Sequence, residues 1–357
     1  MEIGIVGLPN VGKSTLFNAL TGAGAAAENF PFTTIEPNVG VVPLPDHRLT
    51  KLAEMNKSEK IVPAGIRFVD IAGIVKGASQ GEGLGNKFLS HIRSVDAICH
   101  VVRCFTDDNV VNVTGDLDPV SAADTIETEL LLADLQQAEK ALEKFRKPAK
   151  SGDKEAMTKV AGLEEALKGF NDGKPARVLN LPPELIRDFQ FLTSKPLLYI
   201  ANTDEGDPHP DLIAPLKARA EKEKAGLVVL CSKLEAEIQE MPEEERGEYY
   251  KEAGITTPGL MALAQAGQHL LGLACFFTSG PKETRAWLIP KGTRAVKAAG
   301  KIHTDIERGF IRAEVYHFDD LVHLGSCRAV QEKGQVSLEG KDYEIKDGDV
   351  VYFRFNV

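Results

Sequence analysis

Residues Gly7-Leu8-Pro9-Asn10-Val11-Gly12-Lys13-Ser14-Thr15 fit the phosphate-loop pattern G-x-x-x-x-G-K-[ST]. A short apolar run of the β type, Glu2 to Val6, precedes this stretch, and apolar residues at helical spacing follow it from Thr15 to Leu20. Strand, glycine loop and helix in this order bring loop amides and a helix N-terminus to one phosphate group. The stretch therefore predicts a nucleotide-binding domain.

The residue types inside this loop suggest a role for each position. Gly7 and Gly12 permit backbone angles and a close approach that a Cβ would block. Lys13 is expected to reach the β- and γ-phosphates as a catalytic residue, and Ser14 to place its hydroxyl on Mg²⁺. The predicted nucleotide contacts in this loop are Asn10, Val11, Gly12, Lys13, Ser14 and Thr15.

Two further segments have the composition of nucleotide-sensing switches. Segment 29–38, which contains two prolines and two threonines, is expected to close over the γ-phosphate, with Thr34 preferred to Thr33 as a Mg²⁺ ligand. Asp70 ends a strand-like run that starts at residue 65, and we expect it to hold the metal through water. The Gly73 amide is expected to sense the γ-phosphate. The predicted metal ligands are thus Ser14, Thr34 and Asp70, and the predicted catalytic residues are Lys13 and Gly73.

The residue that positions the attacking water is not evident from the sequence. Ras-like enzymes use a glutamine directly after the glycine of this motif. Position 74 is isoleucine here, and its side chain has no hydrogen-bonding group. The glycine-rich segment 77–86, the backbone, a substrate phosphate or a bound partner would have to supply this function, so we expect slow intrinsic hydrolysis.

The segment that should read the base has an altered sequence. A strand-like run from Pro196 to Ala201 ends at Asn202-Thr203-Asp204-Glu205, where GTPases carry N-K-x-D. Asn202 can still address N7, which adenine and guanine share. Thr203 replaces the lysine and Glu205 the aspartate, so the guanine-selective part has changed. A further strand is predicted from Leu227 to Lys233, and it leads into the last base-side loop. The base-side residues predicted to contact nucleotide are Asn202, Thr203, Glu205, Cys231 and Ser232.

The strand-like runs, with others at 38–44 and 97–103, follow the order of a doubly wound α/β domain with its ligand at the carboxyl ends of the strands. His100 lies inside the apolar run 97–103, and we expect it to be a buried, hydrogen-bonded core residue rather than a catalytic one. A helix is also predicted at 185–192. We assign residues 1–272 to this P-loop NTPase domain of the G type.

Two helical runs, 121–147 and 154–170, predict a coiled-coil hairpin inserted into this domain at about residues 121–190. Basic side chains cluster around its tip. This cluster is either a solvated charged face or a contact for RNA phosphates. These side chains are Lys140, Lys144, Arg146, Lys147, Lys150, Lys154 and Lys159.

Residues 273–357 predict a second, smaller domain. Short strand-like runs surround one predicted helix, 294–300, which suits a mixed α+β, ubiquitin-like roll. Its lysines and arginines fit a contact with RNA as well as they fit a plain solvated surface.

Composition limits the partners and the compartment. The 357 residues carry a formal net charge of −10, so any nucleic-acid contact must use a local basic patch. The five scattered cysteines form no C-x-x-C pair, which favours free thiols in a reducing cytosol. No apolar run approaches the ~20 residues of a membrane span, and we expect no signal peptide. We expect a cytoplasmic monomer without a membrane or a sequence-specific DNA partner.

Together these motifs resemble those of the YchF family, the Obg-like ATPases, along the full chain. The matching stretches are 7–15, 29–38, 70–73 and 302–315, the last of which is similar to the signature of that family's C-terminal TGS domain. The resemblance implies a G-type domain with a helical hairpin and a TGS domain, ATP preferred to GTP, slow hydrolysis and association with ribosomes. It also implies Mg²⁺ contacts at Ser14 and Thr34 and an adenine contact through the Thr203 backbone. A histidine that the family is proposed to use in hydrolysis is replaced by Asn112, which cannot act as a base near neutral pH.

The leading hypothesis is therefore a Mg²⁺-dependent P-loop NTPase that prefers ATP and reports its nucleotide state to a ribosome-bound surface. Two alternatives remain open. One is a GTPase of the Obg type, against which the missing lysine at Thr203 argues. The other is a nucleotide-gated RNA- or ribosome-binding module in which hydrolysis is incidental, and both Ile74 and Asn112 are compatible with it.

Overall fold

The computed structural model describes residues 1–25, 38–71, 84–107, 110, 117–206 and 208–356. The chain forms two compact units. Met1–Ala23 and Arg67–Ala266 make up most of the first, whereas Val41–Ile66 and Gly267–Val357 make up most of the second. The domain boundary after residue 272 stays a prediction. The place of Val41–Ile66 in the second unit was not foreseen from the sequence.

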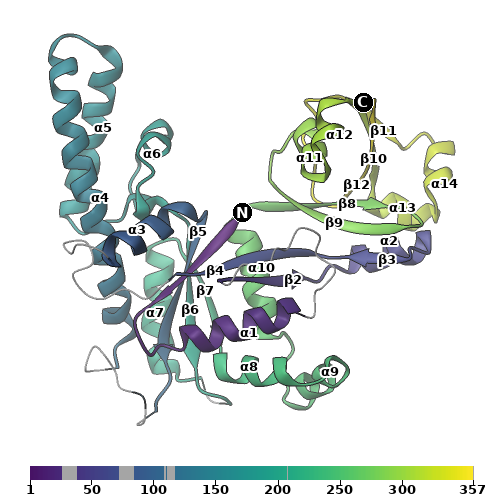
Figure 1. The fold of residues 1–357 in the computed structure, drawn as a ribbon, viewed down its shortest axis with the longest axis horizontal. Coiled ribbons are helices and arrows are strands. Elements are labelled where there is room, and N and C mark those ends of the chain that lie inside the picture. The colour runs from purple at the N-terminus through teal and green to yellow at the C-terminus, as the bar shows by residue number, and fades with distance from the viewer. Residues whose placement is uncertain (26–37, 72–83, 108–109, 111–116, 207, 357) are drawn as a thin grey trace. The chain divides into compact units, whose positions relative to one another are not determined.

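A sheet whose central strands are almost entirely buried organises the first unit, and Figure 1 shows the course of its strands. Its strand order is β2-β4-β1-β5-β6-β7, and β1 pairs in parallel with β4 and β5, β5 with β6, and β6 with β7. This is the doubly wound arrangement that the sequence predicted, and it collects the carboxyl ends of the parallel strands at one edge. The strands are β1 (Glu2–Gly7), β2 (Val39–Leu44), β4 (Ala64–Asp70), β5 (Ala97–Cys104), β6 (Leu197–Thr203) and β7 (Gly226–Leu230).

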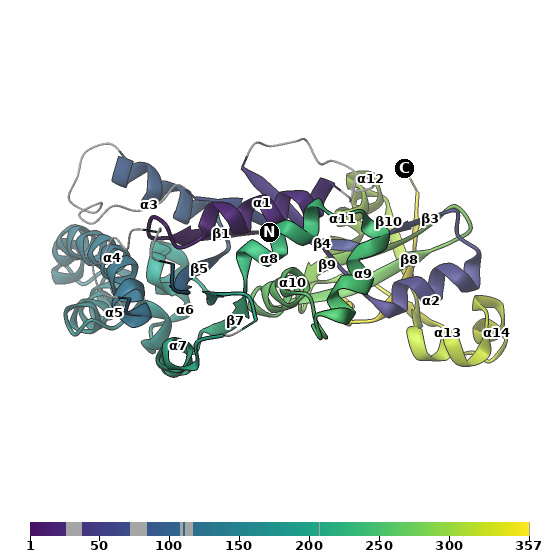
Figure 2. The same ribbon diagram turned by 90° about the horizontal axis from the view of Figure 1, so that it is seen from below.

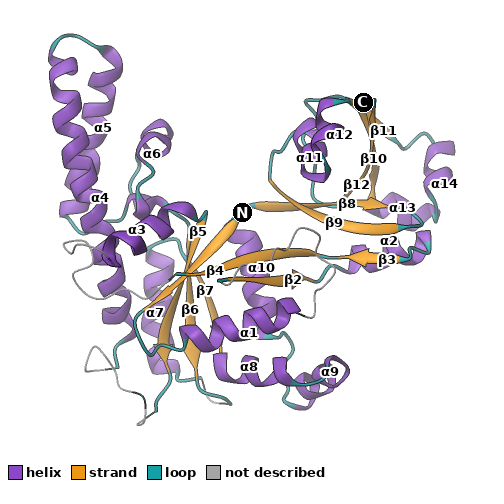
Figure 3. Cartoon of the chain, viewed as in Figure 1, coloured by secondary structure: helices purple, strands orange, loops and turns teal. Residues whose placement is uncertain are grey.

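Helices alternate with these strands along the chain (Figure 3). One boundary differs from the prediction, because the strand expected to reach Lys233 ends at Leu230. Cys231 then caps a helix, its Sγ accepting a hydrogen bond from the Leu234 amide at 3.5 Å. The helices of this sheet are α1 (Lys13–Ala25), α3 (Leu84–Ser94), α7 (Pro210–Lys222), α8 (Ser232–Glu240), α9 (Glu243–Glu252) and α10 (Gly259–Leu270).

The predicted hairpin consists of α4 (Pro119–Lys150) and α5 (Lys154–Asn171). Figures 1 and 2 show the two helices side by side in both views. Asp118 caps the first helix and Asp153 the second, each carboxylate accepting bonds from two backbone amides in the first turn. The 32 residues of α4 span ~48 Å. The apolar seam between the helices contains Ala138, Leu142, Leu163, Ala166 and Phe170.

The helix predicted at 185–192 is shorter than expected. Helix α6 (Pro183–Phe189) ends where Gln190 adopts a left-handed backbone conformation with φ of 46°, and a separate 3-10 turn, η2 (Leu192–Ser194), follows. Another 3-10 turn, η1 (Ala176–Val178), lies between α5 and α6.

Buried charges fasten the hairpin to the sheet. Arg177, in η1, places Nη2 at 2.9 Å from Glu127 Oε2 on α4 and at 2.7 Å from Oε2 of Glu223, the residue that caps the C-terminus of α7. These three side chains are only 10%, 12% and 12% exposed. The Tyr199 hydroxyl on β6 donates to Glu223 Oε2 at 3.0 Å and accepts from Arg219 Nε at 3.0 Å. One network therefore joins α4, η1, α7 and β6.

His100 occupies the buried core position that the sequence predicted, and its hydrogen bonding stays a prediction. Its residue is 4% exposed, and its ring centroid lies 5.6 Å from that of Tyr199. Burial, together with the charges of Arg219 and Arg177, lowers the His100 pKa to about 3, so the imidazole is neutral near pH 7.

The second unit is a mixed α+β fold built on a sheet in the order β11-β10-β12-β8-β9-β3. Alternate residues of β8 pack into two different apolar clusters, Ala274 and Phe276 into one, Cys275 and Phe277 into the other. Side chains of one strand alternate between faces, so both faces of this sheet are covered. The strands are β3 (Lys60–Val62), β8 (Leu273–Ser279), β9 (Glu283–Pro290), β10 (Phe310–His317), β11 (Ser337–Glu339) and β12 (Asp349–Phe355).

The expectation of one helix in the C-terminal part was wrong, since four helices lie between residues 295 and 332. Helix α11 (Ala295–Ile302), the predicted one, contributes to the first cluster, while α13 and α2 contribute Leu321 and Leu52 to the second. A sheet with two apolar faces needs helical cover on both sides. The remaining helices are α2 (His47–Asn56), α12 (Thr304–Arg308), α13 (Phe318–Leu324) and α14 (Cys327–Glu332).

Across the described parts of both units, no helix combines the length and apolarity needed to cross a membrane.

Candidate nucleotide site

The phosphate loop connects β1 to α1 in the predicted way. Asn10 and Gly12 have positive φ angles of 65° and 88°, and the Gly12 carbonyl accepts the Leu16 amide at 2.9 Å. A Cβ on Gly12 would lie 2.1 Å from Asn202 Nδ2, and one on Gly7 would lie 2.8 Å from Val11 Cγ2. The backbone therefore makes a tight turn for which both glycines are required. Loop amides at a helix N-terminus are suited to hold a phosphate.

Lys13 and Asp70 meet at the carboxyl edge of the sheet. Lys13 is the first residue of α1, and Asp70 ends β4, the parallel neighbour of β1. Lys13 Nζ donates to Asp70 Oδ1, and the two side chains are 13% and 25% exposed. A cation and a carboxylate predicted from separate motifs thus form one ion pair. Ser14, directly after Lys13, is exposed.

Asn202 links the phosphate loop to the base-side loops. It is 4% exposed, and its Nδ2 donates to the Val11 carbonyl at 2.9 Å. Its Oδ1 accepts the Ser232 amide at 2.8 Å. The side chain therefore holds the phosphate loop, the tip of β6 and the start of α8 in one arrangement. Contact with purine N7 stays a prediction for the second N–H of the amide.

The other predicted base-side residues lie at the same edge of the sheet. Thr203 is 6% exposed and pairs with Cys104 of β5, whereas Glu205 is exposed. Cys231 is half-buried, and burial raises the pKa of its thiol. Ser232 is 1% exposed, and its Oγ has no hydrogen-bond partner among the described residues.

Sequence reasoning missed Arg103, which organises the start of the loop after β5. The residue is 8% exposed, and its guanidinium donates to the carbonyls of Phe105 at 3.1 Å, Asp107 at 3.1 Å and Val110 at 2.9 Å. It also lies 4.5 Å from the centroid of the Phe105 ring. An arginine that ends a buried apolar strand was the available signal, since such a group needs acceptors nearby.

Three residues that carried predictions, Thr34, Gly73 and Asn112, lie outside the described residues, as does Ile74. The metal and switch roles assigned to Thr34 and Gly73 remain predictions.

The donor set at this edge suits Mg²⁺. Within the described ranges, no three His, Cys, Asp or Glu side chains gather into a metal-binding group. Mg²⁺ in NTPases needs no such group, because it binds one or two protein oxygens together with substrate phosphates and water. The Asp70 carboxylate and the Ser14 hydroxyl are oxygen donors of this kind, and Lys13 would be drawn toward the phosphates.

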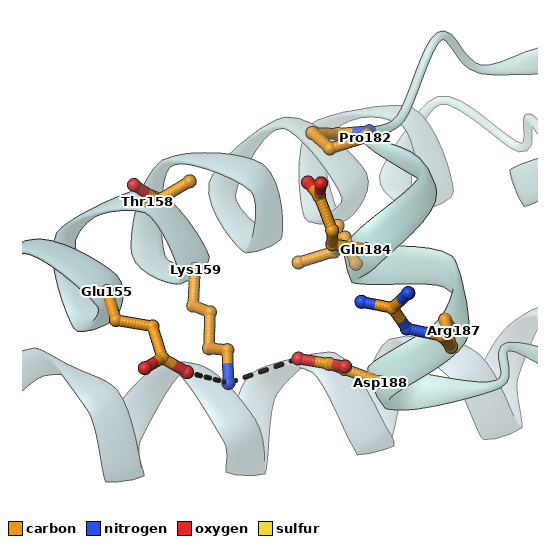
Figure 4. Close-up of a pocket in the computed structure, with 8 residues that line it drawn as sticks. Glu155, Thr158, Lys159, Pro182, Glu184, Arg187 and Asp188 are labelled. Carbon is orange, nitrogen blue, oxygen red and sulfur yellow. Dashed lines mark ion pairs between the residues drawn. The ribbon is translucent and has the colours of Figure 1, made fainter.

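A pocket of about 380 Å³ lies elsewhere, between α5 of the hairpin and α6 (Figure 4). Lys159 spans it, with Nζ at 2.8 Å from Glu155 Oε1 and at 3.1 Å from Asp188 Oδ2. These paired charges fasten α6 to α5. Because its charge is paired here, Lys159 does not belong to the basic cluster predicted at the hairpin tip. The other six members of that cluster are exposed.

Two family models match the chain. One, MMR_HSR1, described as "50S ribosome-binding GTPase", matches residues 2–144. The other, YchF-GTPase_C, described as "Protein of unknown function (DUF933)", matches residues 273–356.

Curated proteins and a solved structure are similar over the full chain. "Ribosome-binding ATPase YchF" of Bacillus subtilis is 51% identical over 364 residues, with 100% of both chains covered. The protein of the same name from Escherichia coli O157:H7 is 51% identical over 363 residues, which cover 100% of this chain and 99% of the relative. The solved structure is "Structure of the Schizosaccharomyces pombe YchF GTPase". It matches with a TM-score of 0.89 at 36% identity, covering 99% of this chain and 97% of that chain.

Proposed function

Since this chain belongs to the YchF family, we propose that it hydrolyses ATP in preference to GTP and binds the ribosome in a nucleotide-dependent way. Relatives at 51% identity over the whole chain are named ribosome-binding ATPases. The observation that carries the proposal is the pairing of Lys13 with Asp70 beside a phosphate loop that Asn202 holds in place.

The chain's own residues supply positioning and charge for hydrolysis. The loop amides from Asn10 to Thr15 hold the phosphates, and Lys13 leaves Asp70 to neutralise charge on the β- and γ-phosphates. Asp70, through water, and Ser14 would be the described residues that hold Mg²⁺, with Thr34 as the proposed further ligand. Mg²⁺, when bound, neutralises the negative charge that builds up on the phosphate oxygens. Water attacks the γ-phosphate in line, and the Gly73 amide senses that group.

The base site favours adenine because the guanine-selective positions have changed. Thr203 offers no lysine stem to pack along the base, and Glu205 is one methylene longer than the usual aspartate. Thr203 contributes its backbone to the base, and Cys231 and Ser232 line the last base-side loop.

The ribosome is the proposed partner. Six exposed basic side chains near the hairpin tip offer one surface for RNA phosphates, and the second unit offers the alternative surface. Because the proposed partner is the ribosome, we expect the protein to act in the cytoplasm. We also expect it to act as a monomer.

The proposal predicts that nucleotide state changes ribosome affinity. Ribosome pelleting of the wild type should show about a tenfold difference in affinity between the AMP-PNP and ADP complexes, because coupling between sites is typically ~1–3 kcal/mol. Lys13→Ala should remove the difference, since its phosphate loop no longer distinguishes the nucleotides. If the wild type binds ribosomes equally well whichever nucleotide is added, the result would instead support a constitutive ribosome-binding module.

A further inference from the structure

We propose that Asp204 is a positioning residue that sets base specificity: it fastens the loop after β5 to the loop after β6 and is thereby withdrawn from reading guanine. This inference rests on the proposed nucleotide function and deepens it. Asp204 lies between two residues already assigned to the base site, Thr203 and Glu205, but no role was predicted for it from the sequence.

The contacts of Asp204 join three segments of the chain. Its Oδ2 accepts the Thr106 amide at 3.0 Å and lies 3.4 Å from Thr106 Oγ1. His209 Nε2, at the N-cap of α7, lies 2.7 Å from the same oxygen. The Asp204 and His209 side chains are 35% and 28% exposed. Burial opposes ionisation of this carboxyl, but the bonds from Thr106 and His209 outweigh it and lower the Asp204 pKa.

The loop that Asp204 holds is also fixed from its other side. Arg103 donates to the carbonyls of Phe105 and Asp107, the residues on either side of Thr106. Arg103 stands opposite Asn202 in the pairing of β5 with β6. Arg103 and Asp204 therefore both hold the backbone around Thr106, and Arg103 is paired with Asn202, the residue that organises the phosphate loop.

This arrangement has different consequences for the two purines. A guanine reader must offer both carboxylate oxygens to the base N1–H and 2-amino groups. Glu205 stands at the position of the usual aspartate. Asp204, one residue before it, cannot serve as the reader in its place without releasing Thr106 and His209, because its Oδ2 already accepts from these donors. Adenine does not present such a pair of donors at this edge. The contacts of Asp204 with Thr106 and His209 therefore stay in place when adenine binds. Base specificity here comes from the contacts of Asp204 that guanine binding would break, as well as from contacts with adenine.

Calorimetric titration of the full chain with AMP-PNP and GMP-PNP in Mg²⁺ tests this role. Asp204→Ala should lower the affinity for AMP-PNP about tenfold, the effect of losing hydrogen bonds to a charged group. It should lower the affinity for GMP-PNP less, so that the ratio of the two affinities becomes smaller. Asp204→Asn should recover most of the AMP-PNP affinity, because its amide oxygen can take the place of Oδ2, which contacts both Thr106 and His209. Asp211→Ala is the control, because it removes an exposed carboxylate from α7, the helix that has His209 at its N-cap. It should leave both affinities unchanged.

Hydrolysis kinetics separate positioning from a general loss of structure. Asp204→Ala should raise the KM for ATP about tenfold and leave kcat within about threefold, since the phosphate loop and Lys13 are untouched. Selective loss of GMP-PNP binding would mean that Asp204 reads guanine, and equal losses for both nucleotides, or none, would also overturn the proposal. A wild type that binds neither nucleotide would refute the proposed function. A wild type that prefers AMP-PNP beside an unchanged Asp204→Ala variant would refute this inference alone.

Discussion

Replacing Lys13 by alanine is expected to lower kcat for ATP hydrolysis about 10²–10³-fold, the usual cost of removing one preorganised group that stabilises transition-state charge. Lys13 is the cation that begins α1, and it pairs with Asp70 where the phosphates are expected to bind. Without it, negative charge on the β- and γ-phosphates loses its protein counter-charge. Phosphate release measured in a single turnover, with enzyme in excess, would report this loss directly.

Two variants control for this result. Lys217→Ala removes an exposed lysine of α7 and should leave kcat unchanged. Lys13→Arg keeps the charge but places a larger, planar group in the loop, so it should restore only part of the rate. Hydrolysis by Lys13→Ala at the wild-type rate would show that the reaction takes place somewhere other than this loop.

Replacing Arg177 by alanine is expected to lower the free energy of unfolding by ~3–5 kcal/mol, the usual cost of breaking a buried ion pair from one side. The change leaves Glu127 and Glu223, each 12% exposed, without their shared guanidinium. Burial already raises the Glu127 pKa against the opposing pull of Arg177, so loss of the arginine adds to an existing cost. Urea denaturation followed by circular dichroism measures the difference.

Arg187→Ala is the matched control, because Arg187 is exposed on α6. It should change the free energy of unfolding by less than ~0.5 kcal/mol, as is usual for surface substitutions. If Arg177→Ala cost no more than this control, the network between η1, α4 and α7 would contribute little to stability. The triple variant Arg177→Met, Glu127→Gln, Glu223→Gln should recover part of the loss, since it removes the unpaired charges as well.

The local part of the site could be predicted from the sequence because its residues are contiguous. The positive φ of Gly12 and the start of α1 at Lys13 follow from the glycine-rich turn before a helical run. Asp70 was expected to end a strand, and it ends β4, the parallel neighbour of β1, so that it lies at the carboxyl edge of the sheet. The ion pair between Lys13 and Asp70 was not predicted, and the roles of both residues toward phosphate and metal remain predictions.

The long-range part could not be predicted in the same way. The contact between Asn202 and Val11 spans 191 positions, and the one between Thr106 and Asp204 spans 98. No pattern in the sequence records such pairings. Comparison with N-K-x-D directed attention to Thr203 and Glu205 and away from Asp204, which makes the contacts. The place of residues 41–66 in the second unit was missed for the same reason, because β3 pairs with β9 across more than 200 residues.

Calorimetric titration of the wild-type protein with AMP-PNP and GMP-PNP in Mg²⁺ tests the central claim most directly. We predict that AMP-PNP binds at least about tenfold more tightly, a difference of about 1.4 kcal/mol, because the residues after Asn202 no longer serve guanine. Equal or tighter binding of GMP-PNP would contradict this account. It would mean that Glu205 or Asp204 still reads guanine, and that the protein is a GTPase switch on the same fold.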